Sequence, residues 1–348
     1  MWIFIILAFL LLLFSAGFYV YAMAKNYYKA SNYTSDEDAM KDFEVVEDID
    51  EVELEDAQGE VLSPEQELEM EENHMEIMEA TPVETSDDVY NVLLIGVDRR
   101  DKSWAGNSDS MILLSLSEQK KQISMISLMR DTYVNIPGVG MRKLNAAHAN
   151  GAGPLLLKTV EENFKIDVDR YVSVDFNALI TIIDELGGIE LTMSEAEVEV
   201  ANHYIGEMCK MQNWNPDDYT ISGGGTRIYK GVQAVAYARI RYVGNSDYQR
   251  TERQRTVLTR MIEKMKSMSV TQLFDFAEDV MPLVTHNIPE DEIWDLLGKA
   301  PSLLQYNLVK DRIPYDGMYS IIYVKKQDML VPDWEKTIQR LKATLYNS

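Results

Sequence analysis

Asn91-Val-Leu-Leu-Ile-Gly-Val97 is the stretch that decides the fold. It is a short apolar run rich in branched side chains, which is typical of a strand buried on both faces. Two further strands are predicted at Met111–Ser117 and Gln122–Leu128, and a polar turn joins them. Thr132–Ile136 is expected to extend the same sheet and to end at the turn Pro137-Gly138.

After this point the pattern alternates between helices and strands. Strands are predicted at Tyr171–Val174 and Ile189–Thr192, and helices at Pro154–Phe164, Phe176–Leu186, Gly231–Ala238, Arg250–Met268 and Asp333–Leu345, with shorter helices after Val270 and Pro289. Such alternation indicates an α/β protein. We therefore predict a single α-β-α sandwich domain with a central mixed sheet over residues 89–348.

The N-terminal residues 1–24 are predicted to be a transmembrane anchor. Trp2–Ala24 is almost entirely apolar, and about 20 such residues are enough to span a bilayer as a helix. A cleaved signal peptide is the alternative, since Ala22-Met23-Ala24 resembles a cleavage site. The missing basic residues before the apolar run favour a retained anchor. Lys25 and Lys29 follow the run, so the positive-inside rule gives a poor signal here.

Most of the net charge of -24 lies in one segment. Between Ser35 and Asp88 there are 23 acidic residues and one lysine, whereas the rest of the chain has 34 acidic and 32 basic residues. Such an unbalanced stretch predicts a solvated, mostly disordered stalk over residues 25–88. Within it, Ser63-Pro64 is the expected start of a short helix that ends at about Glu79.

Several function classes are excluded or disfavoured. The single Cys209 rules out an intrachain disulfide framework, and the four histidines show no metal-ligand spacing. No Walker A, G-x-S-x-G or H-E-x-x-H motif is present. Binding to nucleic acid is disfavoured, because the chain is acidic and the predicted domain is nearly neutral.

Asp98 and Asp109 form the first candidate site. Asp98 follows the buried strand directly, and Asp109 precedes the next one, so an antiparallel pairing of the two strands would bring both carboxylates together. Oxygen ligands with open positions suit Mg²⁺, which keeps water and substrate phosphate in its shell; Mn²⁺ is the alternative ion. The competing interpretation is that both aspartates simply cap turns.

Basic residues form the second candidate site. Arg130 follows a core strand and either binds an anion or pairs with Asp131, and Lys143 leads into a helix. Arginine binds phosphate oxygens bidentately, so a dense group of arginines favours a phosphate-rich ligand over a solvated basic face. The densest group lies further along the chain and comprises Arg239, Arg241, Arg250, Arg253 and Gln254. Arg250 and Gln254 are four residues apart and share a helix face.

These residues lie in motifs that resemble the LytR-CpsA-Psr family. Eight short motifs match in order and spacing between about Asn91 and Met268: G-V-D-R-R, N-S-D-S, S-L-M-R-D-T-Y-V, K-L-N-A-A, V-D-F, L-G-G-I, G-V-Q-A-V-A-Y-A-R-I-R and D-Y-Q-R-T-E-R-Q. Each motif is weak alone, but eight in order are a specific signal. The resemblance also implies a single-pass protein of the cell membrane, with an extracytoplasmic C-terminal domain.

The resemblance implies a phosphotransferase that moves a glycopolymer, of the teichoic acid or capsular polysaccharide type, from a polyprenyl-pyrophosphate carrier to peptidoglycan. It assigns metal binding to Asp98 and Asp109. It assigns the pyrophosphate to Arg99, Arg130, Lys143, Arg239, Arg241, Arg250 and Gln254, to which our reading of the sequence adds Arg253. It also suggests Asp247 as the base that accepts the proton of the acceptor hydroxyl.

Two positions depart from the family pattern, and two alternative functions remain open. Asn107 stands where many relatives carry arginine, and Met129 replaces a common proline. A polyprenyl chain needs an apolar groove, for which Ala178–Leu186 and Leu155–Val160 are candidates, although core packing explains both segments as well. The alternative functions are a polyprenyl-pyrophosphate phosphatase, with water as acceptor, and a non-catalytic envelope protein that binds lipid-linked precursors.

Overall fold

The structure, a computed structural model, describes residues 25, 28–39, 56–98, 105–241, 243, 246–303 and 305–346. The anchor predicted over residues 1–24 lies outside these ranges. Within them, no helix combines the length and the apolar character that a membrane span requires.

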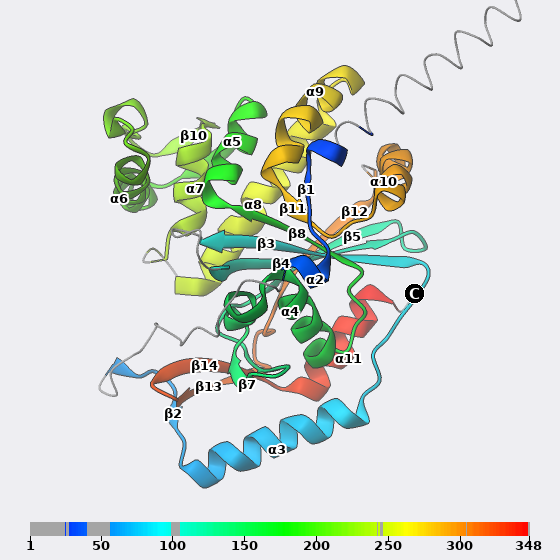
Figure 1. The fold of residues 1–348 in the computed structure, drawn as a ribbon. Coiled ribbons are helices and arrows are strands. Elements are labelled where there is room, and N and C mark those ends of the chain that lie inside the picture. Colours follow the sequence, from blue (N-terminus) through cyan, green and yellow to red (C-terminus); the bar gives the residue numbers. More distant parts are fainter. Residues whose placement is uncertain are drawn as a thin grey trace, which may run out of the picture.

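A mixed sheet forms the centre of the molecule (Figure 1). Its strands are β1 (Asn32–Tyr33), β11 (Thr285–His286), β8 (Arg170–Asp175), β3 (Val89–Asp98), β4 (Asn107–Ser117), β5 (Gln122–Leu128) and β12 (Asn307–Ile313), in this spatial order. β4 runs antiparallel to both β3 and β5, while β8 runs parallel to β3. The predicted mixed sheet is therefore confirmed, including the three strands from which the prediction began.

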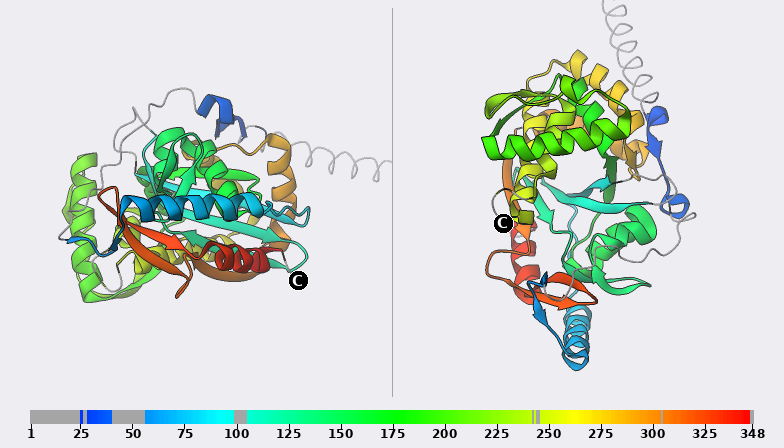
Figure 2. Two further views of the ribbon diagram at one scale, coloured as in Figure 1. Left: turned by 90° about the horizontal axis from the view of Figure 1, so that it is seen from below. Right: turned by 90° about the vertical axis from the view of Figure 1, so that its left-hand side faces the viewer.

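Helices cover both faces of this sheet (Figures 1 and 2). One face carries α5 (Phe176–Glu185), α6 (Glu195–Gln212), α7 (Gly231–Arg239), α8 (Ser246–Lys266) and α9 (Val270–Val280), and the other carries α4 (Ala146–Phe164), α11 (Trp334–Leu345) and α3 (Pro64–Ala80). The apolar residues divide into two large cores, one under each helix layer. This double cover explains why β3 is apolar without alternation.

Small ribbons flank the layers. The predicted strand at Thr132–Ile136 forms as β6 (Tyr133–Ile136), but the expectation that it extends the main sheet is wrong. It pairs with β7 (Gly140–Lys143), because the turn between them, with positive φ at Gly138, reverses the chain at once. The remaining strands also lie outside the main sheet. β9 (Ile189–Met193) pairs with β10 (Gly225–Tyr229), and β13 (Tyr319–Val324) lies between β14 (Gln327–Pro332) and β2 (Glu60–Val61).

The described part of the acidic segment differs from a solvated stalk. The helix predicted from Ser63-Pro64 forms as α3, and Ser63 and Gln66 make a reciprocal capping box. Its residues Met78 and His74 are buried against the domain, and Met78 joins the same core as α4 and α11. A helical apolar stripe therefore outweighs the acidic composition here, and residues 56–88 pack on the domain that was predicted to begin at residue 89.

The C-terminal residues complete the sheet. β12 pairs parallel with β5 along Asn307–Ile313 and forms the edge opposite β1. Between α9 and β12 lie the short helix η3 (Met281–Leu283), β11 and α10 (Glu290–Leu303). The predicted final helix forms as α11, and the side chain of Asp333 caps its first turn. The strands of this region are not among those predicted from the sequence.

His74 makes folding dependent on pH. Its Nε2 donates to Oδ1 of Asn163 at 2.9 Å, its ring packs on Trp334, and its Nδ1 has no hydrogen-bond partner among the described residues. Burial is the main cause that lowers the pKa of His74 to about 4. Between pH 6.5 and 4 the unfolded chain therefore binds a proton that the folded chain does not, and the free energy of unfolding falls as the pH falls.

We predict that this histidine removes up to about 3 kcal/mol of stability as the pH drops from 6.5 to 4. The stabilising contribution of the neutral histidine is fully present above pH 6.5. Carboxylates titrate in the same range, so the matched variant is His74→Gln, which keeps an N–H donor for Asn163 but does not titrate. Urea unfolding at pH 7 and pH 4.5 should show a smaller loss of stability for the variant, and equal losses would contradict the assignment.

Candidate functional site

A cavity of about 810 Å³ lies between the main sheet and helices α5 to α8. One part of its wall is charged, and we call it the charged end: Asp109, Arg130, Arg241, Arg250 and Gln254. Another part is lined by hydrocarbon, and we call it the apolar end: Val172, Val174, Leu258, Met261 and Val284. The cavity is thus suited to a long ligand that is anionic at one end and apolar along the rest.

A β-bulge shapes the charged end. The antiparallel register of β3 and β4 pairs Gly96 with Ser110 and Val97 with Ser108, which leaves Asp109 as the extra residue on β4. Bulges commonly re-aim a side chain beside a functional site, and here the side chain of Asp109 lines the cavity. A Cβ at Gly96 would lie 3.0 Å from the Cβ of Ser110, so glycine avoids a tight contact opposite the bulge.

The same register supports the predicted meeting of the two aspartates. Asp98 is paired with Asn107, two residues from Asp109 on the neighbouring strand. The structure describes the backbone of Asp98 at the end of β3. The side chain of Asn107 also lines the cavity, so this departure from the family pattern lies at the site itself.

Two guanidinium groups converge on the carboxylate of Asp109. Nη1 of Arg130 lies 3.2 Å from Oδ1 of Asp109, and Nη2 of Arg241 lies 3.8 Å from the same oxygen. Arg130 follows β5, and Arg241 follows α7, so two distant segments meet here. Two positive charges around one carboxylate leave capacity for a further anion.

Asp131 supports Arg130 from behind. Oδ2 of Asp131 lies 3.4 Å from Nε of Arg130, and its Oδ1 lies 2.8 Å from Nζ of Lys143. Burial alone would raise the pKa of Asp131, but Arg130 and Lys143 outweigh it, and the pKa lies below its ordinary value. Lys143 is buried in this pair and does not line the cavity, so its predicted direct contact with pyrophosphate is replaced by a positioning role.

Arg239 lies on the wall formed by α6. Its guanidinium stacks between the rings of Phe176 and Tyr204, with centroid distances of 5.0 and 4.8 Å, and Nη2 lies 3.8 Å from Oε2 of Glu207. Such stacking fixes the plane of the guanidinium. The partly exposed Arg239 therefore presents a fixed edge to the cavity.

Helix α8 separates the predicted arginines into two roles. Arg250 and Gln254 share the face that lines the cavity, as their spacing predicts. Arg253 is buried on another face, where Nη1 donates to the carbonyl of Ile240 at 3.2 Å and Nε binds Glu197 at 3.0 Å. The prediction that Arg253 binds pyrophosphate is therefore not met by the geometry, because these contacts turn the guanidinium toward the end of α7.

Besides Asp98, two further predicted residues cannot be placed by their side chains. Arg99 lies outside the described residues. Asp247 lies in the first turn of α8, one turn before Arg250, and the structure describes its backbone only. Its predicted role as a base stays a prediction.

One of the two segments considered for an apolar groove lines the cavity. Leu179 and Ile182 of α5 line the cavity. In the other segment, Leu156 and Val160 of α4 are fully buried in the core on the opposite face of the sheet. Core packing, the alternative considered for both, therefore holds for α4.

Helix α6 contributes wall residues that the sequence analysis missed. His203, Tyr204 and Glu207 come from this helix, and Asp175 comes from the N-cap of α5. The signal for α6 was present in Ser194, whose capping box with Glu197 precedes apolar residues at helical spacing. The residues of the wall themselves have no motif that marks them.

The described residues contain no group of three or more His, Cys, Asp or Glu side chains placed to hold a metal. The structure describes Asp98 by its backbone alone. Among the described side chains, the oxygen donors beside the end of β3 are the Asp109 carboxylate and the neighbouring Asn107 amide. This oxygen-only set fits an ion that takes the rest of its shell from water and substrate phosphate.

Comparisons with known proteins find the same family along most of the chain. Residues 59–342 match the LytR_cpsA_psr family. The chain is 32% identical over 267 residues to the polyisoprenyl-teichoic acid–peptidoglycan teichoic acid transferase TagT of Bacillus subtilis, covering 75% of this chain and 77% of that protein. It is also 32% identical to the enzyme TagU of Enterococcus faecalis, over 66% of this chain and 69% of that protein.

Solved structures agree. TagT bound to LI-WTA superposes with a TM-score of 0.59 at 28% identity, covering 76% of this chain and 92% of that one. TagT with bound octaprenyl pyrophosphate lipid gives a TM-score of 0.55 at 26% identity, over 78% and 94% of the two chains. With the matched region extending from α3 through α11, the chain belongs to the LytR_cpsA_psr family.

Proposed function

We propose that this protein is a phosphotransferase that attaches a glycopolymer from a polyprenyl-pyrophosphate carrier to peptidoglycan. The observation that carries the proposal is the divided cavity, in which Arg130, Arg241 and Arg250 lie at one end and hydrocarbon lines the other. Relatives bear the name of teichoic acid transferases that act on a polyisoprenyl-linked substrate and peptidoglycan. One relative holds octaprenyl pyrophosphate.

The divided cavity supports the following placement of the carrier. The pyrophosphate lies at the charged end, where guanidinium groups bind its oxygens in pairs. The polyprenyl chain lies along the apolar end, against β8, α5 and α8. We assign the glycopolymer, of the teichoic acid or capsular polysaccharide type, to the polar part of the wall at Arg239 and Glu207.

The reaction exchanges one bond to phosphorus for another. A hydroxyl of peptidoglycan attacks the phosphorus that carries the glycopolymer, a P–O bond forms to the acceptor, and the P–O bond to the polyprenyl phosphate breaks. The hydroxyl proton passes to a base, for which Asp247 is our candidate, and polyprenyl phosphate leaves. Phosphoryl transfer depends mainly on positioning and on stabilising the charge of the transferred group, which the arginines provide.

Asp98 and Asp109 would hold a divalent ion, Mg²⁺ or Mn²⁺. Their placement on paired strands and the neighbouring Asn107 amide supply oxygen ligands for it. When bound, the ion neutralises charge on the pyrophosphate oxygens. Arg130 and Arg241 keep the carboxylate of Asp109 turned toward the cavity.

We also propose that the protein is a single-pass protein of the cell membrane, anchored through residues 1–24, with its folded domain extracytoplasmic. The apolar sequence of these residues and the chemistry of the substrate support this location. A polyprenyl carrier is itself embedded in the membrane, and peptidoglycan lies outside it.

The proposed activity is tested by incubating the full-length protein with Mg²⁺, a polyprenyl-pyrophosphate-linked oligosaccharide and peptidoglycan fragments. Mass spectrometry should detect a phosphodiester-linked glycan on the fragments together with free polyprenyl phosphate. Release of lipid phosphate without an adduct would replace the transferase with a hydrolase. Tight lipid binding without turnover would indicate a binding protein.

Replacing Arg241 by alanine should lower the transfer rate by roughly a hundredfold to a thousandfold, because one preorganised donor to the transferred phosphate is lost. The matched control is Arg260→Ala, which removes the same charge from the exposed, Glu263-paired part of α8. Both variants should unfold at the wild-type temperature. Equal rates for the two variants would contradict the placement of the pyrophosphate at the charged end.

Substituting Asp98→Asn should weaken the binding of Mn²⁺ by about tenfold or more, since one anionic ligand becomes neutral. Electron paramagnetic resonance of free Mn²⁺ measures this binding without any turnover. Asp217→Asn is the control, because Asp217 lies exposed in η2 (Pro216–Asp218), outside the cavity lining. Unchanged Mn²⁺ affinity in Asp98→Asn would show that the end of β3 does not hold the ion.

A further inference from the structure

A segment near the N-terminus is built into the edge of the main sheet. β1 runs parallel to β11, with Asn32 opposite Thr285 and Tyr33 opposite His286 (Figure 1). The backbone N–H of Asn32 donates to the carbonyl of Val284 at 3.3 Å, and that of Thr34 donates to the carbonyl of His286 at 3.0 Å. Residues 28–39, which we call the N-terminal clamp, thus add a strand to the domain from outside its family-matched region.

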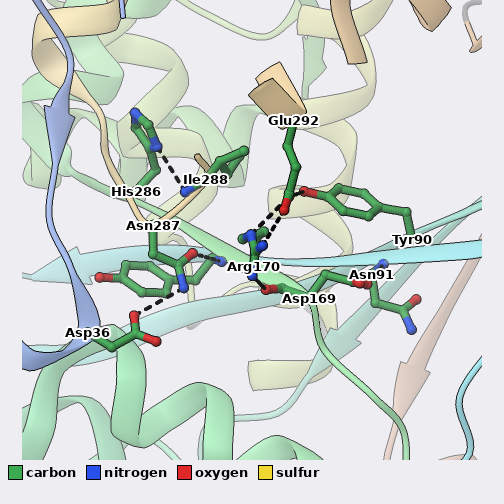
Figure 3. A network of polar contacts seen from close by, with 10 residues as sticks. Asp36, Tyr90, Asn91, Asp169, Arg170, His286, Asn287, Ile288 and Glu292 are labelled. Carbon is green, nitrogen blue, oxygen red and sulfur yellow. Dashed lines mark hydrogen bonds and ion pairs between the residues drawn. The ribbon is translucent and has the colours of Figure 1, made fainter. Parts of the chain in front are cut away.

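Side chains hold the N-terminal clamp on both sides of β1. The side chain of Asn32 donates to the carbonyl of Pro282 at 2.7 Å. Beyond the strand, the amide of Asn287 donates to Asp36 at 3.1 Å, while its oxygen accepts from the backbone N–H of Tyr171 at 2.9 Å. Figure 3 shows this amide lying between Asp36 and the main sheet. The N-terminal clamp is therefore joined to β8 as well as to β11.

His286 completes the attachment. Its Nδ1 accepts from the backbone N–H of Ile288 at 3.2 Å (Figure 3). The ring proton is therefore on Nε2, which lies 2.9 Å from Oγ of Ser31 and donates to it. Burial lowers the pKa of His286, which favours this neutral form. The rings of Tyr28 and Tyr33 each lie 6.0 Å from the imidazole.

Polar contacts connect the elements around the N-terminal clamp. Arg170 on β8 binds both carboxylate oxygens of Glu292, and the hydroxyl of Tyr90 donates to the same carboxylate at 2.9 Å (Figure 3). These contacts tie α10 to β8 and β3. The edge on which the clamp rests is thus fixed to the centre of the sheet.

The N-terminal clamp lies at the apolar end of the cavity. Val284, which accepts the hydrogen bond from Asn32, also lines the cavity. Asp109 at the charged end belongs to β4, and the strand order from there is β3, β8, β11 and then β1. At a strand spacing of about 4.8 Å, the charged groups are about 14 Å across the sheet from β11. The cavity thus becomes apolar toward the edge that receives the clamp.

The distance between the predicted anchor and this edge is short. Seven residues separate Ala24 from Asn32, and a fully extended chain over these eight steps spans at most about 26 to 29 Å. Residues 28–30 are helical, which shortens the span further. A free stalk from residue 25 to residue 88 would instead allow a span of about 200 Å.

We propose that the N-terminal clamp holds the apolar end of the cavity at the membrane surface, so that the polyprenyl chain enters the cavity directly from the bilayer in which the protein is anchored. The proposal rests on the proposed function and on the predicted anchor. It assigns the β1–β11 edge as the membrane-facing side of the domain. The acidic residues that follow α2 (Asp36–Ala39) come after this attachment in the chain, so they do not set the distance between anchor and domain.

The position of the domain can be measured without any turnover. In full-length protein carrying Cys209→Ala, a single cysteine replaces either Asp279, exposed near the end of α9, or Lys310, exposed on β12 at the opposite edge. A fluorophore on each cysteine reports energy transfer to an acceptor-labelled lipid in liposomes. Transfer should be clearly stronger from position 279 than from position 310.

Thr34→Pro tests the N-terminal clamp itself, because proline removes the N–H that bonds to His286; Thr34→Ala keeps that N–H and is the matched control. Thr34→Pro should make energy transfer from the two positions similar, while Thr34→Ala should preserve the difference. Equal transfer from both positions in the control, or an unchanged difference in Thr34→Pro, would overturn the proposal.

A second readout separates this inference from the proposed function. Thr34→Pro should slow turnover of a long-chain carrier embedded in liposomes several-fold, yet leave turnover of a short-chain carrier in detergent unchanged, since the cavity is intact. Equal loss on both substrates would overturn the role of the N-terminal clamp in lipid entry. If the control protein turns over neither substrate, the proposed function fails, and the energy-transfer result still decides where the domain lies.

Discussion

The largely buried carboxylate of Asp131, whose side chain is 14% exposed, fixes the geometry on which the site depends. It binds Nε of Arg130 and Nζ of Lys143, and its pKa lies below the ordinary value despite burial. An unpaired buried charge would be costly, so the pair and the carboxylate stabilise one another. With Asp131 in place, Arg130 reaches Asp109 on the neighbouring strand β4. Arg241, which follows α7, approaches the same carboxylate. Among the described residues, this cluster has three cationic and two anionic side chains, and we propose that an anionic ligand binds to it.

Around this cluster, the fold separates charge from hydrocarbon within one cavity. The β-bulge at Asp109 turns a carboxylate into the cavity, whereas Val174 on β8 and Met261 on α8 continue the wall as hydrocarbon. A pyrophosphate that carries a long apolar chain matches both parts. The N-terminal clamp lies at the apolar end of this cavity, because Val284 lines the cavity and also accepts a hydrogen bond from the backbone of Asn32.

Much of the fold could be predicted from local patterns, and the errors have physical causes. The strand at Asn91–Val97 was clear because both of its faces are buried, and α3 was clear from its cap at Ser63. Pairing partners were less accessible, since a short run such as Tyr133–Ile136 specifies a strand but not its neighbour. The acidic composition hid the helical stripe that buries Met78.

At the site, spacing on one helix predicted the shared face of Arg250 and Gln254, but it did not show that Arg253 turns toward the carbonyl of Ile240.

We propose one direction for the ligand in the cavity, with its pyrophosphate at the charged end and its chain at the apolar end. A crystal structure of the protein with polyprenyl pyrophosphate and Mn²⁺ tests it most directly. We expect the pyrophosphate to lie against Arg130 and Arg241, an anomalous Mn²⁺ peak to appear beside Asp109, and the polyprenyl chain to lead toward Val284. Pyrophosphate away from these arginines, or a chain that leaves by the opposite edge of the sheet, would contradict it.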